Sequence, residues 1–285
     1  MITGKTKLLG VIGAPIAHSL SPIIQNAALH AAGLDYVYAA LPVRAGALAS
    51  AVHGLRDAGY MGFNVTIPFK TEIIPLMDDL SEDARRIQAV NTVAIEGGRM
   101  IGHNTDAAGF LAGLTERNIA IAGKRAVLIG AGGAARAALW GLLRSGVSSI
   151  VIGVRSVGKG MALAANFAAD GDVRALSFDD PAFCVAFRAA DIVVQTTPLG
   201  MSPRVEEKPP VDAAIMNPAA VAYDLIYTPA ETRFLREAAA HGIATINGET
   251  MLAAQGTEAF RLWTGVRPDM ELMKRVLREE LVRRG

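Results

Sequence analysis

One glycine-rich turn restricts the fold of this chain more than any other feature. Gly130-Ala131-Gly132-Gly133-Ala134-Ala135 follows an expected strand at residues 124–129, apolar from 126 on, and precedes an alanine-rich run at 134–145. The pattern G-x-G-x-x-A between a strand and a helix is typical of dinucleotide-binding units. Gly130 permits the tight turn, Gly132 lets the backbone approach a pyrophosphate, and the helix amides attract phosphate. The alternative is a turn that only packs a helix on a strand.

The end of the next expected strand, residues 149–154, indicates which dinucleotide binds. An NAD enzyme usually places Asp or Glu there, about 20 residues on, to bind the ribose 2′-hydroxyl. Here Val154 is followed by Arg155 and Ser156, and Lys159 lies close behind. Arg155 can pair with a 2′-phosphate, which a carboxylate would repel; its alternative role is that of a solvated loop cation. We therefore predict NADP as the cofactor.

Strands and helices alternate along the chain, which predicts an α/β fold with two lobes. We expect an N-terminal α/β substrate domain over 1–105 with a mostly parallel sheet. A Rossmann-type NADP-binding domain should cover 106–247, and C-terminal helices in 248–285 should return to the first lobe. Expected strands cover residues 8–13, 36–41, 62–67, 89–95, 124–129, 149–154, 191–195 and 221–226, with a hairpin turn at 97–98 and helices starting near 22, 47, 81 and 107.

Composition argues against several classes of protein. A net charge of +1 without a long basic run does not suit a nucleic-acid binder. No segment has the ~20 apolar residues that span a membrane. The single cysteine, Cys184, cannot form an internal disulfide, which suits a reducing cytoplasm. His18 and His103 lack the spacing of metal ligands, so we expect no metal site.

Polar residues gather where strands are expected to end, which is where open α/β sheets bind ligands. Several of these stretches, in their order along the chain, resemble shikimate dehydrogenase, and the resemblance covers nearly the whole sequence. They are Gly13–Pro22, Asn64–Lys70, Ala89–Thr92, Gly102–Asp106, Thr196–Met201, Tyr223–Pro229 and Asn247–Gln255.

The resemblance implies reversible NADP-dependent reduction of 3-dehydroshikimate to shikimate, a step of aromatic amino-acid biosynthesis, by a cytoplasmic monomer or homodimer. Lys70 and Asp106 would form the catalytic pair. Ser19 and Ser21 would hold the substrate carboxylate, while Asn64, Thr66, Asn91, Asp106 and Gln255 would contact its hydroxyls and Tyr227 would line the pocket. The expected cofactor contacts are Gly130, Ala131, Gly132, Gly133, Ala134, Val154, Arg155, Ser156, Lys159, Thr196, Gly248 and Met251.

The chemistry of the pair makes sense independently of the resemblance. Reduction of a ring ketone requires hydride from a nicotinamide and a proton donor at the oxygen. Lys70 supplies a charged donor that also stabilises a developing alkoxide, and Asp106 would orient it. The sequence leaves open which of the two is the formal proton carrier.

The same residues could instead have purely structural roles. Ser21 and Asp106 could each cap a helix, and Lys70 could lie on the surface. Asn64 and Asn91 could satisfy backbone groups at strand ends. Gln255 could face solvent.

The sequence also departs from the family pattern in places. Gln25-Asn26 stands where His-Asn is frequent, Val154 where Asn is common, and Gln195 where Asn usually precedes the Thr-Thr-Pro segment. The alternatives are a quinate or mixed quinate/shikimate dehydrogenase and, in another class, a non-catalytic NADP-binding sensor. The sensor would not need both Lys70 and Asp106.

We predict that Arg155→Asp abolishes the preference for NADP over NAD. The new carboxylate would repel a 2′-phosphate and accept a hydrogen bond from a 2′-hydroxyl. Steady-state kcat/KM values for the two cofactors measure this preference. Unchanged discrimination would refute the role of Arg155.

Overall fold

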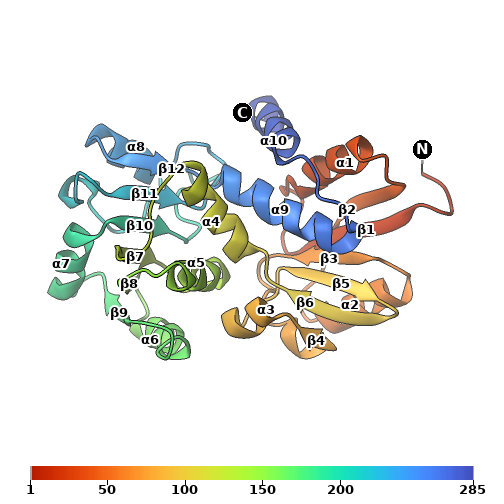
Figure 1. Ribbon diagram of the computed structural model, residues 1–285, viewed down its shortest axis with the longest axis horizontal. Coiled ribbons are helices and arrows are strands. Elements are labelled where there is room, and N and C mark those ends of the chain that lie inside the picture. Colours follow the sequence, from red (N-terminus) through yellow and green to blue (C-terminus); the bar gives the residue numbers. More distant parts are fainter. Residues whose placement is uncertain (1, 285) are drawn as a thin grey trace. The chain divides into compact units, whose positions relative to one another are not determined.

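The computed structural model describes residues 2–284, which form two compact units (Figure 1). The first contains the described residues up to Gly109 and from Ala253 onward, and the second is Phe110–Leu252. The chain leaves the first unit within helix α4 (Asp106–Glu116) and re-enters it within helix α9 (Glu249–Thr264). Within residues 2–284, no helix is long and apolar enough to cross a membrane.

The first unit is built on a six-stranded mixed sheet with the order β2-β1-β3-β5-β6-β4. Strand β1 is parallel to β2 and β3, whereas β5 is antiparallel to β3 and β6. Gly97 and Gly98, both at positive φ, form the tight turn between β5 and β6 that makes this pair a hairpin. The sheet is therefore more mixed than the alternation of strands and helices predicted. The strands are β1 (Lys7–Gly13), β2 (Tyr36–Pro42), β3 (Gly62–Val65), β4 (Asp79–Leu80), β5 (Thr92–Glu96) and β6 (Arg99–His103).

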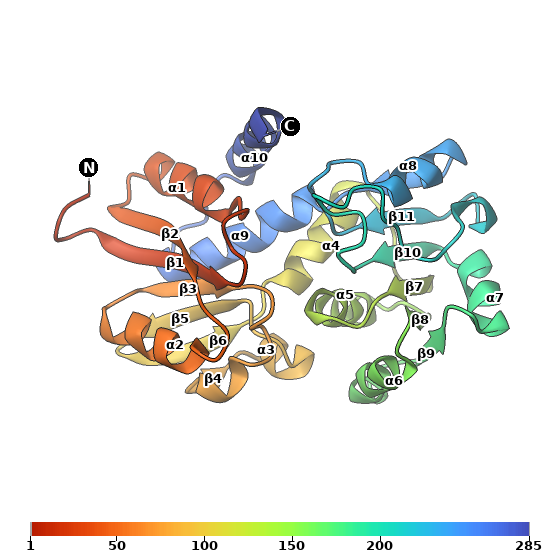
Figure 2. The same ribbon diagram turned by 180° about the vertical axis from the view of Figure 1, so that it is seen from behind.

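Helices cover this sheet, and its central strands are buried on both faces. All four residues of β3 are buried, and Phe63, Val65 and Val93 share one core cluster with Val52 of α2. Helix α1 packs against α10, which joins the two ends of the chain within this unit (Figure 2). The helices are α1 (Ser21–Ala31), α2 (Leu48–Asp57), the 3₁₀ turn η1 (Ile74–Leu76), α3 (Glu82–Ile87) and α10 (Met270–Arg284).

The second unit has a fully parallel sheet with the order β12-β11-β10-β7-β8-β9. This is the order of the Rossmann fold, in which the direction of winding reverses between β7 and β10 and nucleotides bind at that point. The strands are β7 (Arg125–Ile129), β8 (Ser149–Val154), β9 (Val173–Ser177), β10 (Ile192–Gln195), β11 (Val221–Asp224) and β12 (Ala244–Ile246).

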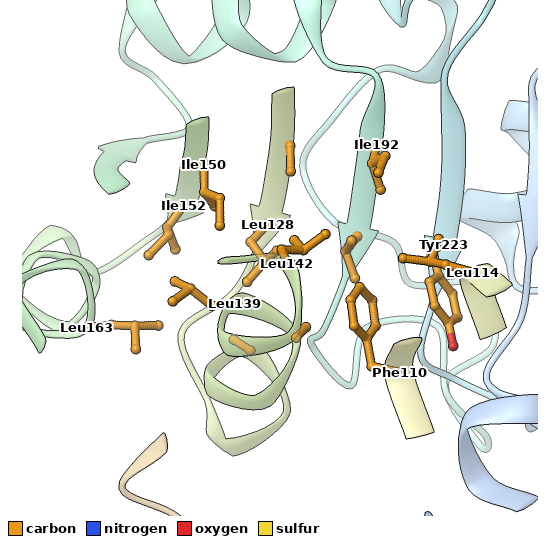
Figure 3. Packing of buried hydrophobic residues seen from close by; sticks show 14 of the residues in the cluster. Phe110, Leu114, Leu128, Leu139, Leu142, Ile150, Ile152, Leu163, Ile192 and Tyr223 are labelled. Carbon is orange, nitrogen blue, oxygen red and sulfur yellow. The ribbon is translucent and has the colours of Figure 1, made fainter. Parts of the chain in front are cut away.

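Small residues let helix α5 (Gly133–Arg144) lie close to this sheet. Ala135 and Ala138 are completely buried in the same cluster as Leu128 of β7, and Phe110 stacks on Tyr223 with 5.2 Å between ring centroids (Figure 3). The other helices of the unit are α6 (Val157–Asn166), α7 (Pro181–Ala189), the 3₁₀ turn η2 (Ala213–Ile215) and α8 (Arg233–Ala240).

We predict that Gly62→Ala destabilises the protein. A Cβ at this position would lie 2.3 Å from Nε1 of Trp263 and 2.4 Å from the carbonyl oxygen of Val93, and these two atoms share a hydrogen bond. Overpacking of this kind lowers the free energy of unfolding by about 1–3 kcal/mol, which urea denaturation would measure.

The matched control is Gly54→Ala on α2, where an added Cβ meets open space. Removing a glycine from a helix should raise the free energy of unfolding by about 0.5–1 kcal/mol. A Gly62→Ala protein as stable as the parent would contradict the packing described for Trp263.

Candidate active site

Two adjacent parallel strands of the first unit deliver the predicted substrate loops to one edge of the sheet. Strand β1 ends at Gly13 and β3 at Val65, and the amide of Ala14 donates to the carbonyl of Ile67 at 3.1 Å. A Cβ on Gly13 would lie 2.6 Å from Cγ2 of Thr66. Glycine at this position therefore allows the loop that carries Ser19 to approach the segment that carries Thr66 and Lys70.

Lys70 and Asp106 form an ion pair. The ammonium of Lys70 donates to Oδ2 of Asp106, with the two side chains 18% and 7% exposed. Lys70 lies in the turn that follows β3, and its carbonyl accepts from the amide of Val90 at 2.7 Å. Asp106 is the first residue of α4. The pair is thus largely shielded from water, with both backbones fixed.

Asn91 orients the carboxylate of this pair. Its Nδ2 donates to Oδ1 of Asp106 at 2.8 Å and to Oγ1 of Thr105 at 2.9 Å, while its Oδ1 accepts from the amide of Thr105 at 2.8 Å. The position of Asn91 follows from the β5–β6 hairpin, because its amide donates to the carbonyl of His103. Asn91 therefore contacts the catalytic candidate and also satisfies backbone, as the alternative role predicted.

Asn64 is held from two sides, and one of its partners was not predicted from the sequence. The hydroxyl of Tyr38 donates to Oδ1 of Asn64 at 2.6 Å. Nδ2 of Asn64 donates to the carbonyl of Asn91 at 3.1 Å and to Oγ1 of Thr92 at 2.9 Å. Both amide hydrogens of Asn64 are thus used inside the protein. Tyr38 is buried, which raises the pKa of its hydroxyl.

Neither Ser21 nor Asp106 acts as the helix cap that its position allowed. The N-cap of α1 is Leu20, with no side-chain cap, and Ser21 is the first helical residue. Oγ of the half-buried Ser19 accepts from the amide of Ser21 at 3.3 Å. At the start of α4, Oδ1 of Asn104 accepts from the amide of Asp106 at 3.1 Å.

The last substrate candidate of the first unit is Gln255 on α9. It is half-buried, and its Oε1 accepts from Nδ2 of Asn91 at 3.5 Å. Gln255 therefore faces the same polar cluster as Asp106 and does not simply project into solvent. The first unit brings Lys70, Asn64, Asn91, Asp106 and Gln255 into one connected network.

In the second unit, the glycine turn has the features of a phosphate site. Gly130 has φ of +110°, which few other residues adopt. Helix α5 has Gly132 as its N-cap without a side-chain cap, and an added Cβ on the exposed Gly132 would meet open space. A ligand could approach this backbone closely, and the first amides of α5 lack a side-chain acceptor at their cap.

The end of β8 provides positive charge in the same unit. Val154 is buried, whereas Arg155, Ser156 and Lys159 are exposed. Ser156 is the N-cap of α6, but its hydroxyl makes no capping hydrogen bond. In the part of the chain that the structure describes, neither Arg155 nor Lys159 has an ion-pair partner. These groups suit a phosphate on the adenosine ribose.

Asp224 holds the segment that carries Tyr227. Sequence patterns indicated Asp224 only as part of the stretch Tyr223–Pro229 and gave it no role of its own. Its carboxylate accepts from the amide of Ile226 at 3.0 Å and from Oγ1 of Thr232 at 2.7 Å. Asp224 is fully buried, and burial raises its pKa to about 7 although both hydrogen bonds lower it. Tyr227 itself is half-buried.

The start of α9 is packed tightly against this segment. A Cβ on Gly248 would lie 2.0 Å from the carbonyl oxygen of Leu225, so Gly248 is required by packing. Met251 is 8% exposed and belongs to the core of the unit. Among residues 2–284, no group of three or more His, Cys, Asp or Glu side chains could hold a metal ion.

Three family models match this chain. The shikimate dehydrogenase substrate-binding domain matches residues 11–93, the shikimate/quinate 5-dehydrogenase model matches 113–209, and the shikimate 5′-dehydrogenase C-terminal domain matches 248–278.

Proteins of known identity are similar over almost the full length. The NADP(+) shikimate dehydrogenase of Geobacter metallireducens is 47% identical over 278 residues, which is 96% of each chain. A crystal structure of a shikimate dehydrogenase with NADP+ has a TM-score of 0.91 and 40% identity, covering 99% of this chain and 98% of that one. The Thermus thermophilus enzyme with NADP(H) and shikimate has a TM-score of 0.87 and 37% identity, covering 96% and 99%.

We predict that the carboxyl group of Asp224 titrates near pH 7, far above an ordinary aspartate at 3.8. The folded state then binds a proton between these values that the unfolded state has lost. The stability contributed by this proton is complete below about pH 4 and is lost as the pH rises to about 7. Carboxyl ¹³C NMR would detect the titration directly, and Asp224→Asn identifies the signal because it removes it.

Thr232→Val is the matched variant for this titration. It removes a hydrogen bond that stabilises the charged form, so the pKa of Asp224 should rise further. A carboxyl that titrates near pH 4 in the parent protein would show that water reaches Asp224.

Proposed function

The chain belongs to the shikimate dehydrogenase family, and we propose that Lys70 and Asp106 perform its proton chemistry. It is an oxidoreductase that interconverts 3-dehydroshikimate and shikimate with NADP(H), a step of aromatic amino-acid biosynthesis. The observation that carries the assignment of the pair is the ion pair of Lys70 with Asp106, held by Asn91 at 2.8 Å.

Residues of the second unit fit the cofactor. The glycine turn 130–134 would hold the pyrophosphate, since Gly132 leaves open space and the α5 cap makes no side-chain hydrogen bond. Arg155, Ser156 and Lys159 would hold the 2′-phosphate. NADPH, when bound, supplies the hydride that reduces the ring carbonyl. Further cofactor contacts are proposed at Val154, Thr196, Gly248 and Met251.

Lys70 would move the proton. In the reduction, its ammonium donates a hydrogen bond to the carbonyl oxygen and transfers a proton as that oxygen becomes an alkoxide. The product is a secondary alcohol, and the neutral amine regains a proton from solvent. In the oxidation the amine accepts the proton of the alcohol. Asp106 accepts a hydrogen bond from the ammonium and so orients it.

The remaining polar groups would bind the rest of the substrate. We propose that the hydroxyls of Ser19 and Ser21 hold the carboxylate, because both residues lie at the start of α1, in the segment that follows β1. Asn64, Thr66 and Gln255 would contact ring hydroxyls, and Asn91 would act chiefly through Asp106. Tyr227 would line the pocket from a loop that Asp224 braces.

The ion pair of Lys70 with Asp106 also weighs against a non-catalytic NADP sensor. A sensor needs the glycine turn and Arg155 but has no use for a shielded ammonium–carboxylate pair held by Asn91. We also propose that the enzyme works in the cytoplasm as a monomer or homodimer, with residues 1–105 and 248–285 as the substrate domain and 106–247 as the NADP domain.

A direct test follows NADPH absorbance with the purified protein. Shikimate and quinate would each be supplied with NADP+ and with NAD+. Rapid reduction of NADP+ by shikimate, with lower kcat/KM for quinate and for NAD+, is the expected result. Absence of turnover with shikimate would overturn the assignment, and preference for quinate would move the chain to the quinate branch.

We predict that Lys70→Ala lowers kcat by roughly a hundredfold to ten-thousandfold, the usual contribution of a general acid–base residue. The dissociation constant for shikimate should change little, because other groups hold the substrate. Lys5→Ala, which removes an exposed lysine of the same unit, is the control and should leave kcat unchanged. Full turnover by the Lys70→Ala enzyme would exclude Lys70 from the chemistry.

A further inference from the structure

Gln195 is a buried polar residue at the point of the second sheet where nucleotides bind in this fold. It is the last residue of β10 and has no exposed surface. Its register partners are Ile129, which directly precedes the glycine turn, and Asp224 on the other side. The order of strands reverses between β7 and β10, so Gln195 borders the switch point of the sheet.

The carboxamide of Gln195 is completely used by the loop that follows it. Nε2 donates to the carbonyls of Thr197 and Leu199, each at 3.0 Å, and Oε1 accepts from the amide of Thr197 at 2.7 Å. The loop thus presents two acceptors and one donor, which a carboxamide satisfies. A carboxylate has no hydrogen to donate and an apolar side chain would leave all three backbone groups without this partner.

This loop in turn contacts the glycine turn. Oγ1 of Thr196 donates to the carbonyl of Ile129 at 2.7 Å. A Cβ on Gly130 would lie 2.7 Å from Oγ1 of Thr196 and 2.8 Å from Cγ2 of Thr197. The backbone at Gly130 therefore lies directly against two threonines, of which Thr197 is hydrogen-bonded to Gln195 and Thr196 is its neighbour in the chain.

We propose that Gln195 is a positioning residue for the nucleotide, acting through Thr196 and Thr197 on the glycine turn. Its side chain does not touch the turn itself; it sets where the supporting loop lies. Loss of its hydrogen bonds would let this loop move, and the amides that receive the pyrophosphate would no longer be held in place. The inference rests on the proposed function of the turn as an NADP site.

The test compares Gln195→Met with the parent enzyme. Methionine has nearly the shape of glutamine but cannot form the three hydrogen bonds. We expect the dissociation constant for NADP+, measured by titration calorimetry without turnover, to rise about tenfold, which corresponds to about 1.4 kcal/mol. The KM for NADP+ should rise in parallel, while kcat and the KM for shikimate stay within about twofold of the parent values.

Two further variants keep the result interpretable. Gln195→Asn retains the carboxamide on a side chain one methylene shorter, so it should weaken NADP+ binding less than Gln195→Met does, and it serves alone if the methionine variant does not fold. Ser145→Ala removes a 2.8 Å hydrogen bond to the carbonyl of Gly141 at the far end of α5. This control should leave the affinity for NADP+ unchanged.

Unchanged affinity for NADP+ in a folded Gln195 variant would overturn the proposal. Equal losses in kcat, in the KM for shikimate and in the affinity for NADP+ would also overturn it, since they would show a general structural role. A parent protein that binds NADP+ but does not oxidise shikimate would refute the proposed reaction and leave the role of Gln195 standing.

Discussion

The ion pair between Lys70 and Asp106 is the interaction on which the proposed chemistry of the first unit depends. A shielded ammonium and carboxylate lose much hydration, and this loss is offset only if each has good partners. Asn91 donates to the carboxylate of Asp106, and Asn104 fixes the backbone of Asp106 by accepting from its amide. The polar cluster around the pair therefore keeps one lysine available in one orientation.

Sequence patterns predicted the parts of the molecule in which the interacting residues are close together in the chain. The glycine turn lies between β7 and α5, and the cations after β8 are exposed, because strand, turn and helix are contiguous in sequence there. The pairing of Lys70 with Asp106 came from resemblance to a family, since 36 residues separate the two positions. Spacing alone could not have shown that they meet.

The residues that hold the site residues in place could not be predicted from sequence patterns. Tyr38 reaches Asn64 across 26 positions, and only the register of β1 with β2 and β3 brings them together. In the sequence Gln195 is only a departure from a family pattern, because the backbone groups that its side chain binds are set by the fold of the following loop. The hairpin at 97–98 was predicted from its two glycines, whereas the antiparallel pairing of β3 with β5 was not, because it joins strands far apart in the sequence.

The hydrogen bonds of Asn64 have a consequence for selectivity. Both amide hydrogens of Asn64 are donated inside the protein, and its oxygen already accepts from Tyr38. The side chain can therefore offer an incoming molecule only the remaining lone pair of that oxygen. The oxygen of Asn64 would accept a hydrogen bond from a hydroxyl on the ring carbon that it faces, but it could not form one with a carbonyl oxygen there. A ring turned the wrong way round would therefore place its carbonyl oxygen against another acceptor.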